Sequence, residues 1–271
     1  MKSYVISLAT ASERRAHIER EFAARKVEFE FFDAVTPATI DATARAVGLD
    51  SGRTALHPPE LACLLSHVSL WKKAVDERLD HIAIFEDDIH LGEHAADFLM
   101  NSAWIPPQCE IVKLEAFYRK ITVTTEQAPI VLPHQRRLLI LDEAHMGGGG
   151  YIISQSAALE LTGFAAQSNE LAPVDHIVFA QYPRATGSKI HQMSPALCIQ
   201  DMHLTKGSTR FPSYLQDQRS IRKGENKEKA KLSVPDKLRR ERERVLKQMR
   251  RALHELLQRF QGRRTIRIRF K

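Results

Sequence analysis

Apolar and polar residues form two kinds of pattern along the chain up to about residue 205. Short apolar runs at 4–8, 29–32 and 81–89 have the length and composition of strands. Between residues 59 and 78, apolar residues instead recur every three or four positions, which predicts a helix that leads directly into the third run. A strand, a loop, a helix and a strand in this order are typical of a parallel sheet, so the pattern predicts an α/β fold.

The same pattern continues through the second half of this region. It predicts a strand at 110–114, a hairpin-like excursion at 121–140 and a helix at 156–166. Four consecutive glycines at 147–150 lead into a further strand that precedes this helix. Because glycine lacks a Cβ, we expect these residues to form a mobile lid or to bring the backbone close to a ligand.

The hydrophobic pattern changes toward the C-terminus. Residues 206–235 are polar, with glycine, serine, proline and charges of both signs, and predict a linker. Across 236–271, apolar residues recur at helical spacing while arginine and lysine fill the other faces, which predicts a basic amphipathic helix. Its apolar positions are Leu238, Val245, Leu246, Met249, Leu253, Leu256, Leu257 and Phe260. The chain is therefore expected to consist of a compact domain over 1–205, a linker and a helical tail.

Charge is distributed unevenly between these parts. The net charge of the chain is +7, but residues 236–271 contain 14 Lys or Arg against 4 Asp or Glu, which leaves a net −3 for the rest of the chain. Basic residues on an amphipathic helix favour binding to anionic lipid headgroups. The alternative is that the apolar stripe packs on the domain or on a second copy of itself.

Composition also narrows the cellular setting. The sequence has no run of 18 or more apolar residues, and its first residues lack the layout of a signal peptide, so we expect a cytoplasmic protein. The three cysteines, Cys63, Cys109 and Cys198, are odd in number and far apart. They predict neither a disulfide framework nor a zinc site of paired cysteines.

The most informative motif is Glu86-Asp87-Asp88, which ends the apolar run at 82–85. Three adjacent carboxylates at the end of a buried strand repel one another, and burying an unpaired charge is costly. Such residues are easier to accommodate where they share a divalent cation with a phosphorylated ligand. Since alternate residues of a strand point the same way, Glu86 and Asp88 are expected on one face. The alternative is a solvated acidic turn after an edge strand.

Basic and polar residues elsewhere are candidates for contacts with such a ligand. Arg14 and Arg15 follow the first strand, where nucleotides bind outside the carboxyl ends of strands in α/β sheets. A solvated helix start is the alternative for these two arginines. Ser66 and His67 belong to an otherwise apolar helix and need polar partners, which either a ligand or the core can supply.

Two further positions in the second half of the domain are candidates for chemistry. Asp175 begins a predicted helix after Pro173 and is a candidate general base, the group that deprotonates an attacking hydroxyl. A helix-capping carboxylate is the alternative for this residue. Asp201 and His203 end the compact region, where His203 or Asp201 could complete a metal site; both residues are nearly as well explained by an exposed surface.

With these residues assembled, the chain resembles family 25 glycosyltransferases of the bacterial lipooligosaccharide galactosyltransferase type. The resemblance spans about residues 2–205, and its short segments follow in the same order, which makes it more specific than any single motif. These segments are 5–8 with Glu13-Arg14-Arg15, 32–34, 60–63 with Ser66-His67 and Trp71, 85–88, 150–154, 173–175 and 195–203.

The resemblance implies a GT-A-like Rossmann-type fold with a mixed, mostly parallel sheet flanked by helices. It also implies an inverting enzyme that moves galactose from UDP-galactose to a terminal glucose or N-acetylglucosamine of lipooligosaccharide, through a β-1,4 linkage, with Mn²⁺ or Mg²⁺ at the acidic motif. On the matching positions, Asp88 together with Glu86 or Asp87 would hold the metal and the diphosphate. The donor pocket would be lined by Ser7, Leu8, Arg14, Ala34, Ser66, His67 and Asp87.

Two other functions use the same features differently. A sugar-phosphate nucleotidyltransferase needs similar metal and nucleotide contacts, but this chain lacks the N-terminal glycine-rich phosphate loop with a following lysine that such enzymes usually have. A non-enzymatic nucleic-acid-binding protein would use the basic tail, in which only Phe260 and Phe270 are available to stack on bases. We therefore expect a glycosyltransferase that does not bind nucleic acid and that residues 236–271 attach peripherally to the inner membrane, near its lipid-linked acceptor.

Overall fold

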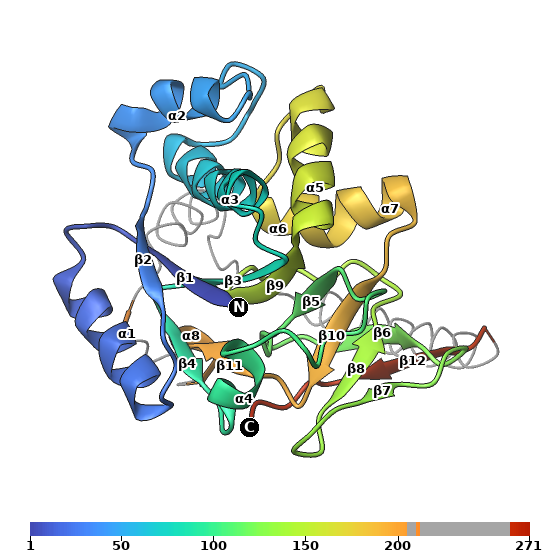
Figure 1. The fold of residues 1–271 in the computed structure, drawn as a ribbon. Coiled ribbons are helices and arrows are strands. Elements are labelled where there is room, and N and C mark those ends of the chain that lie inside the picture. Colours follow the sequence, from blue (N-terminus) through green and yellow to red (C-terminus); the bar gives the residue numbers. More distant parts are fainter. Residues whose placement is uncertain (205–209, 212–260) are drawn as a thin grey trace, which may run out of the picture.

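The computed structural model describes residues 1–204, 210–211 and 261–271, which build a mixed sheet of eight strands with helices on both faces (Figure 1). From edge to edge, the strands are β2 (Glu30–Asp33), β1 (Lys2–Ser7), β3 (His81–Glu86), β9 (Gly150–Ser154), β5 (Ile111–Lys113), β10 (Ile190–Ser194), β8 (Arg137–Ile140) and β7 (Ile130–Val131). Strands β2, β1, β3, β5 and β10 run in one direction, while β9 and β8 run against them. The predicted α/β class with a mixed, mostly parallel sheet is confirmed.

The central strands send side chains alternately to the two faces of the sheet, as the strand pleat requires. In β3, Ile82 and Ile84 join the core cluster on one face, while Ala83 and Phe85 join the cluster on the other. All four side chains are fully buried, because both faces of this strand are covered. The apolar run ends at Glu86, where the chain reaches the edge of the core.

One face of the sheet is covered by α3 (Pro58–Asp76) and α5 (Gln155–Gln167) (Figure 1). The same layer contains the 3-10 turn η1 (Pro37–Thr39), α2 (Ile40–Ala46), α6 (Val174–His176), the π-helix η2 (Ile177–Gln181) and α7 (Tyr182–Thr186). Helix α3 is the helix predicted at 59–78. Prolines are tolerated in its first turn, where amide protons have no partner within the helix. Glu60 supports this start, because its carboxylate accepts a hydrogen bond from the His57 amide at 3.3 Å.

The opposite face carries α1 (Ser12–Ala24), α4 (Ala95–Leu99) and α8 (Asp201–Leu204) (Figure 1). A two-stranded antiparallel sheet of β4 (Ile89–Leu91) and β11 (Cys198–Gln200) lies in this layer. Ile18 and Phe22 of α1 belong to the same buried cluster as Val5 and Phe85 of the sheet. Because β4 follows the acidic motif directly, its pairing with β11 returns residues 198–200 to the side of that motif.

The last residues of the chain correct one prediction. Arg263–Ile266 form strand β12, which pairs antiparallel with β6 (Ile121–Thr124), so the helix predicted over 236–271 is wrong here. Ile268 is buried, and Phe270 forms a β-bridge with Ala196. The physical reason is that apolar side chains from 266 to 270 alternate with arginines, a period of two that suits a strand edge better than a helix.

The other predictions for the C-terminal part fall outside the described residues. These are the linker at 206–235, apart from residues 210 and 211, and the helical pattern at 236–260. Within the described ranges, no helix combines the length and the apolar composition needed to cross a membrane. The three cysteines are all free, as predicted.

Candidate active site

The acidic motif lies at the edge of the sheet where the parallel strands β1, β3 and β5 end. Ser7 ends β1, Glu86 ends β3, and Glu115 follows β5 by two residues. The glycine run at 147–150 reaches the same edge, because the Gly149 carbonyl accepts a hydrogen bond from the Glu86 amide at 3.2 Å. Ligand sites of open α/β sheets form outside the carboxyl ends of the strands. The motif therefore occupies the position where such a site is expected.

Asp87 points toward the first strand and the first helix. Its carboxylate accepts hydrogen bonds from Ser7 Oγ at 2.7 Å and from Arg14 Nη1 at 2.5 Å. Both side chains of the Arg14–Asp87 pair are 13% exposed, so the pair is only lightly screened by solvent. The structure thus brings together three of the residues predicted to bind the donor.

Glu86 and Asp88 share a different partner. Gln200 of β11 directs its side-chain Nε2 to Glu86 Oε2 at 2.7 Å and to Asp88 Oδ1 at 3.2 Å. The two carboxylates therefore lie on one side of the motif and Asp87 on the other, as strand alternation predicts. Gln200 was not a candidate from the sequence, because nothing in its surroundings distinguishes it from other glutamines near a strand end.

The environment of Glu86 and Asp88 disfavours two negative charges. Burial raises the pKa of Asp88 to about 6, although Arg14 acts in the opposite direction. Burial, followed by the charges of Asp88 and Glu115, raises the pKa of Glu86 well above its usual range. A divalent cation would relieve this repulsion, and carboxylate oxygens are the donors that Mn²⁺ and Mg²⁺ prefer. The pair therefore fits the metal ion that the resemblance implies.

Lys113 at the end of β5 is a residue that the sequence did not single out. Its side chain is fully buried, and its Nζ donates hydrogen bonds to the carbonyls of His145, Met146 and Gly147 at 2.9, 2.6 and 2.7 Å. Burial lowers the pKa of this lysine to about 8, while the nearby charge of Glu115 opposes the change. Lys113 therefore ties the segment before the glycines to the central sheet.

Glu115 holds the next part of the same loop. It is fully buried, and its Oε2 accepts a hydrogen bond from the Gly149 amide at 3.1 Å. Burial raises the pKa of Glu115 to about 7, partly offset by Lys113. The signal that could have identified both residues is the charge at alternate positions 113 and 115, where a strand parallel to β3 ends.

The glycine run is fixed by close approaches of its backbone to these side chains. Gly147 has φ +102°, and a Cβ there would lie 2.7 Å from Glu115 Oε2. A Cβ on Gly149 would lie 2.8 Å from Gln200 Cγ. Of the two roles predicted for this run, the described contacts favour a close approach of the backbone, made here to the residues of the acidic site.

Asp175 lies on the other side of this loop from the acidic motif. Its Oδ2 accepts a hydrogen bond from the Gly147 amide at 3.1 Å, and its Oδ1 accepts one from the His176 amide at 3.0 Å. A Cβ on Gly148 would lie 3.8 Å from Glu86 Oε1 and 4.0 Å from Asp175 Cβ, so this glycine lies close to both residues. The half-buried Asp175 thus joins the group around the acidic motif, with one oxygen also contacting the first turn of its own short helix.

Ser66 and His67 of α3 are both fully buried, but their hydrogen bonds differ. Ser66 Oγ donates to the Ala62 carbonyl at 2.8 Å and accepts from the Val35 amide at 2.9 Å, so the core satisfies it. His67 Nδ1 lies 2.9 Å from Tyr151 Oη, whereas its buried Nε2 has no hydrogen-bond partner among the described residues. Burial lowers the pKa of His67 to about 4, which leaves a neutral imidazole beside the site.

The remaining donor-pocket candidates lie at the ends of β1 and β2. The Ala34 amide donates to the Ser7 carbonyl at 2.9 Å, and the Leu8 carbonyl accepts from Arg15 Nε at 3.1 Å. Arg15 also pairs with Asp33, so it supports the backbone of this corner. Leu8 and Ala34 therefore lie next to Ser7, and their role in binding a donor stays a prediction.

His203 lies away from the carboxylates that it was expected to join. Its ring contacts the rings of Phe117 and Tyr118, with centroids 4.8 and 5.2 Å apart. In the part of the chain that the structure describes, His203 belongs to no group of three or more close metal-ligating side chains. The structure thus places Gln200 rather than His203 beside Glu86 and Asp88.

This arrangement combines an oxygen-donor pair for a cation, a basic residue and a further carboxylate around one backbone loop. A cation at Glu86 and Asp88 and the guanidinium of Arg14 can balance a diphosphate. Asp175 can accept a proton on the far side of the loop. These are the parts that a transfer from a nucleotide diphosphate requires.

Comparisons with known proteins agree with this chemistry. The family described as "Glycosyltransferase family 25 (LPS biosynthesis protein)" matches residues 1–178. Lacto-N-neotetraose biosynthesis glycosyltransferase LgtE of Neisseria gonorrhoeae is 39% identical over 216 residues, which cover 76% of each chain. LgtB of Neisseria meningitidis, with the same description, is 40% identical over 215 residues and 76% of each chain. Lipooligosaccharide biosynthesis protein lex-1 of Haemophilus influenzae is 29% identical over 283 residues, covering 93% of this chain and 92% of that protein.

Solved structures resemble the chain only remotely. The apo crystal structure of mouse xyloside xylosyltransferase 1 covers 71% of each chain with 11% sequence identity and a TM-score of 0.42. A likeness at this level does not bear on the chemistry of the site. The relationship of this chain to known proteins therefore rests on the family match and on the three bacterial relatives.

Proposed function

The chain belongs to glycosyltransferase family 25, and from this premise we propose that it transfers galactose from UDP-galactose to a terminal glucose or N-acetylglucosamine of lipooligosaccharide. We further propose that the reaction inverts the anomeric centre and forms a β-1,4 linkage. The observation that carries the proposal is the pair of partly buried Glu86 and buried Asp88, which share one neutral donor at the carboxyl end of β3. Its bacterial relatives act in lacto-N-neotetraose biosynthesis by name, which supports a hexose-transferring enzyme.

The donor nucleotide would bind beside Asp87. Arg14 and Ser7 already contact this carboxylate, and the orphaned Nε2 of His67 offers an uncommitted polar atom in a buried position. Glu86 and Asp88 would hold Mn²⁺ or Mg²⁺, which neutralises the charge of the leaving diphosphate when bound. Arg14 is placed to contribute a second positive charge to the same group.

Asp175 would act as the general base toward the acceptor hydroxyl. It is half-buried, so an acceptor can reach it, whereas Glu115 is fully buried behind the glycine loop. An inverting reaction needs its base on the side opposite the departing diphosphate. The closeness of Gly148 to both Glu86 and Asp175 places the two residues near the same part of the loop.

We also propose a peripheral position at the cytoplasmic surface of the inner membrane. This proposal rests on the sequence of residues 236–260, where arginine and lysine surround an apolar stripe. Each basic residue near an anionic surface contributes on the order of 1 kcal/mol to membrane binding. The acceptor is itself carried by a lipid, so such attachment would bring the enzyme and its substrate to the same surface.

The proposal is tested with the purified full chain and a panel of donors and acceptors. UDP-galactose, UDP-glucose and UDP-N-acetylglucosamine would each be supplied with Mn²⁺ and with glucoside or N-acetylglucosaminide acceptors, and NMR would define the linkage of the product. Of the three donors, we expect turnover only with UDP-galactose, and the product should have a β-1,4 linkage. Turnover should be lost when a chelator is added and in the Asp88→Ala variant. Turnover of that variant in chelator at the wild-type rate would overturn the metal assignment, while preference for another donor would overturn the galactose assignment.

A further inference from the structure

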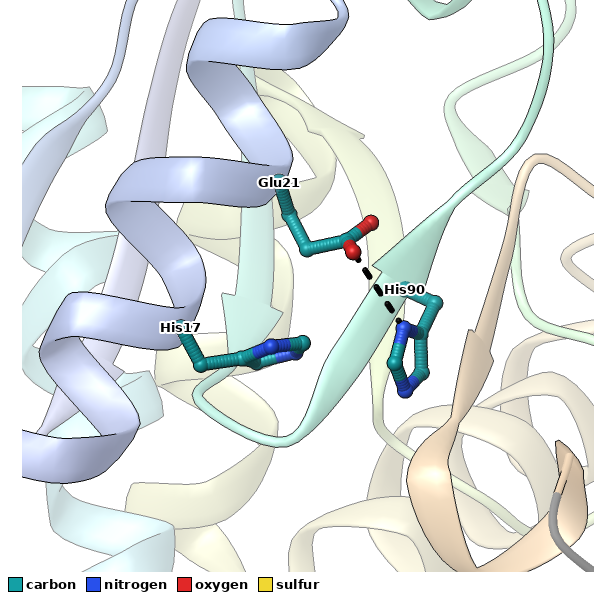
Figure 2. Close-up of side chains that lie close together, drawn as sticks. All are labelled: His17, Glu21 and His90. Atoms are coloured by element: carbon teal, nitrogen blue, oxygen red, sulfur yellow. Dashed lines mark hydrogen bonds and ion pairs between the residues drawn. The ribbon is translucent and has the colours of Figure 1, made fainter.

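A second group of side chains that could bind a metal lies between α1 and β4, in the layer that contains α1, α4 and α8. Figure 2 shows His17 and Glu21 projecting from α1 toward His90 of β4. Residues four apart on a helix share one face, so His17 and Glu21 reach the same point. One ligand atom from each of the three side chains lies within 4.8 Å of the other two. The structure thus gathers two imidazoles and one carboxylate without using any residue of the acidic motif.

Each of these three side chains has one polar atom held by a partner outside the group. The contacts run from His17 Nε2 to the Ile89 carbonyl at 2.9 Å, from His90 Nε2 to Asp201 Oδ1 at 3.0 Å, and from the Leu91 amide to Glu21 Oε2 at 3.1 Å. Donation from His17 Nε2 to a carbonyl leaves the lone pair of that ring on Nδ1. His90 has the equivalent arrangement, with Nε2 against a carboxylate and Nδ1 3.4 Å from Glu21 Oε1. Histidines that bind metals usually have their other ring nitrogen fixed in this way.

We propose that His17, Glu21 and His90 form a zinc site that is separate from the acidic motif. Two imidazole nitrogens and one carboxylate oxygen are a donor set that Zn²⁺ takes, with a solvent molecule as the fourth ligand. Asp201 adds a second negative charge next to the site, so Glu21 and Asp201 together balance the charge of the ion. His17 is buried while Glu21 and His90 are partly exposed, which leaves a path for the ion from solvent.

The ion would fasten both sides of the acidic motif. On one side, β4 begins immediately after Asp88, and His90 is its second residue. On the other side, α1 carries Arg14, which pairs with Asp87. An ion that joins α1 to β4 would therefore hold the two segments that position the acidic motif. This inference rests on the geometry between α1 and β4 and stands whether or not the proposed sugar transfer is correct.

The test is metal binding by the full chain after removal of bound metal. Zn²⁺ would be titrated calorimetrically, and Co²⁺ would be followed by its visible absorption, which reports nitrogen ligands. We expect tight binding of one Zn²⁺ per chain and a rise in the unfolding temperature with Zn²⁺. His90→Ala and Glu21→Gln should lose both effects. Asp201→Asn should bind with about 10- to 100-fold lower affinity, because it frees the orientation of His90.

Controls separate this site from other groups on the chain. Asp88→Asn removes a carboxylate of the acidic motif and should leave the Zn²⁺ titration unchanged. His134→Ala disrupts the exposed group of His94, Asp97 and His134 and should also leave it unchanged. The inference is wrong if the wild-type chain binds no Zn²⁺, or if Glu21→Gln and His90→Ala, folded by circular dichroism, bind it as tightly as the wild type. Loss of tight binding in Asp88→Asn or His134→Ala alone would also overturn it.

Discussion

Asp175 and Glu115 illustrate how two carboxylates with similar contacts differ at the level of single residues. Each accepts a hydrogen bond from an amide of the glycine run, Asp175 from Gly147 and Glu115 from Gly149. Only Asp175 is open enough to meet an acceptor, since Glu115 is fully buried. Because both carboxylates contact the same loop, variants of the two residues can distinguish a role in the proposed proton transfer from a role in holding the loop.

We expect Asp175→Asn to lower the transfer rate by about 10²- to 10⁴-fold while leaving UDP binding intact, because it removes a positioned base. The rate would be measured at saturating donor and acceptor, and UDP binding by calorimetry. Glu115→Gln serves as the comparison, because it changes a carboxylate that holds the loop without reaching the acceptor. An Asp175→Asn enzyme that turns over normally but unfolds more easily would instead assign this residue a structural role.

Lys113 holds the segment before the glycines in place, because its side chain donates hydrogen bonds to three consecutive carbonyls. Lys113→Met should destabilise the fold by about 2–4 kcal/mol, because the carbonyls of His145, Met146 and Gly147 lose their donor inside the protein. Urea unfolding would measure this loss. Lys72→Met on the exposed side of α3 is the control and should change stability little, since Lys72 makes a surface ion pair with Asp76.

At the residue scale, the sequence predicted the positions that combine a strong local pattern with unusual chemistry. Asp87, Arg14 and Ser7 meet because two parallel strands end at one edge, a relation that apolar runs reveal. Lys113 and Gln200 escaped prediction because their partners are backbone carbonyls and carboxylates far away along the chain. The charges at alternate positions 113 and 115 were the one local signal for Lys113, and no local signal marks Gln200.

Glycine positions within elements offer a direct test of how closely the loop and strand pack. Gly150→Ala at the start of β9 should destabilise the protein by more than 1 kcal/mol, because a Cβ there would overlap Cys198 Sγ and lie 3.0 Å from Phe85. Gly163→Ala in α5 is the matched control. Nothing lies within 4 Å of a Cβ at that position, so alanine should stabilise the helix by about 0.5–1 kcal/mol. Thermal unfolding would measure the stability of both variants. If their unfolding temperatures shift equally and in the same direction, the packing described for Gly150 is wrong.

Strand β12 and the residues after it pack on the rest of the described fold. Ile268→Ala should cost about 2–4 kcal/mol, because the side chain is buried beside Ile121 and Ile199. Arg267→Ala, exposed on the neighbouring position, should have little effect. Denaturant titration would compare the two variants. If both are equally harmless, the last residues do not contribute to the stability of the domain.

Elements with a long, regular pattern were the most predictable. The helix expected at 59–78 and the strand expected before Glu86 were both found, because burial on one or both faces dictates every residue type in them. Strand β12 was missed because its sequence, Arg-Arg-Thr-Ile, continues the basic composition of the preceding segment, and the alternation that follows it covers only residues 266–270. A period of two within an arginine-rich stretch was the available signal.

Across the whole molecule, buried histidines couple stability to pH. Burial lowers the pKa values of His67 and His191 to about 4 and that of His145 to about 3. Histidine titrates near 6.5 in the unfolded chain, so the unfolded state takes up protons first as the pH falls. These groups therefore contribute stability above about pH 6.5 that is lost progressively toward pH 4, by up to about 3 kcal/mol each.

We expect these histidines to lower the free energy of unfolding as the pH falls from 6.5 to 4, while the raised pKa values of Asp88 and Glu115 act in the opposite direction over part of this range; urea titration at several pH values measures the sum. His191→Gln should flatten this dependence, because glutamine does not titrate. A variant that loses stability in acid as steeply as the wild-type protein would show that other groups set the acid limit. Replacing exposed His176 by Gln is the control and should leave the slope unchanged.

The segment between residues 212 and 260 starts and ends on the described fold. Phe211 is buried against His17 of α1, and β12 pairs with β6 shortly after residue 260. A protease site engineered between Phe211 and strand β12 would therefore not release a peptide from the folded protein. A cut in a tail attached at one end only would release one. The nicked protein should migrate as one species in native gel filtration and separate into two fragments only in denaturant.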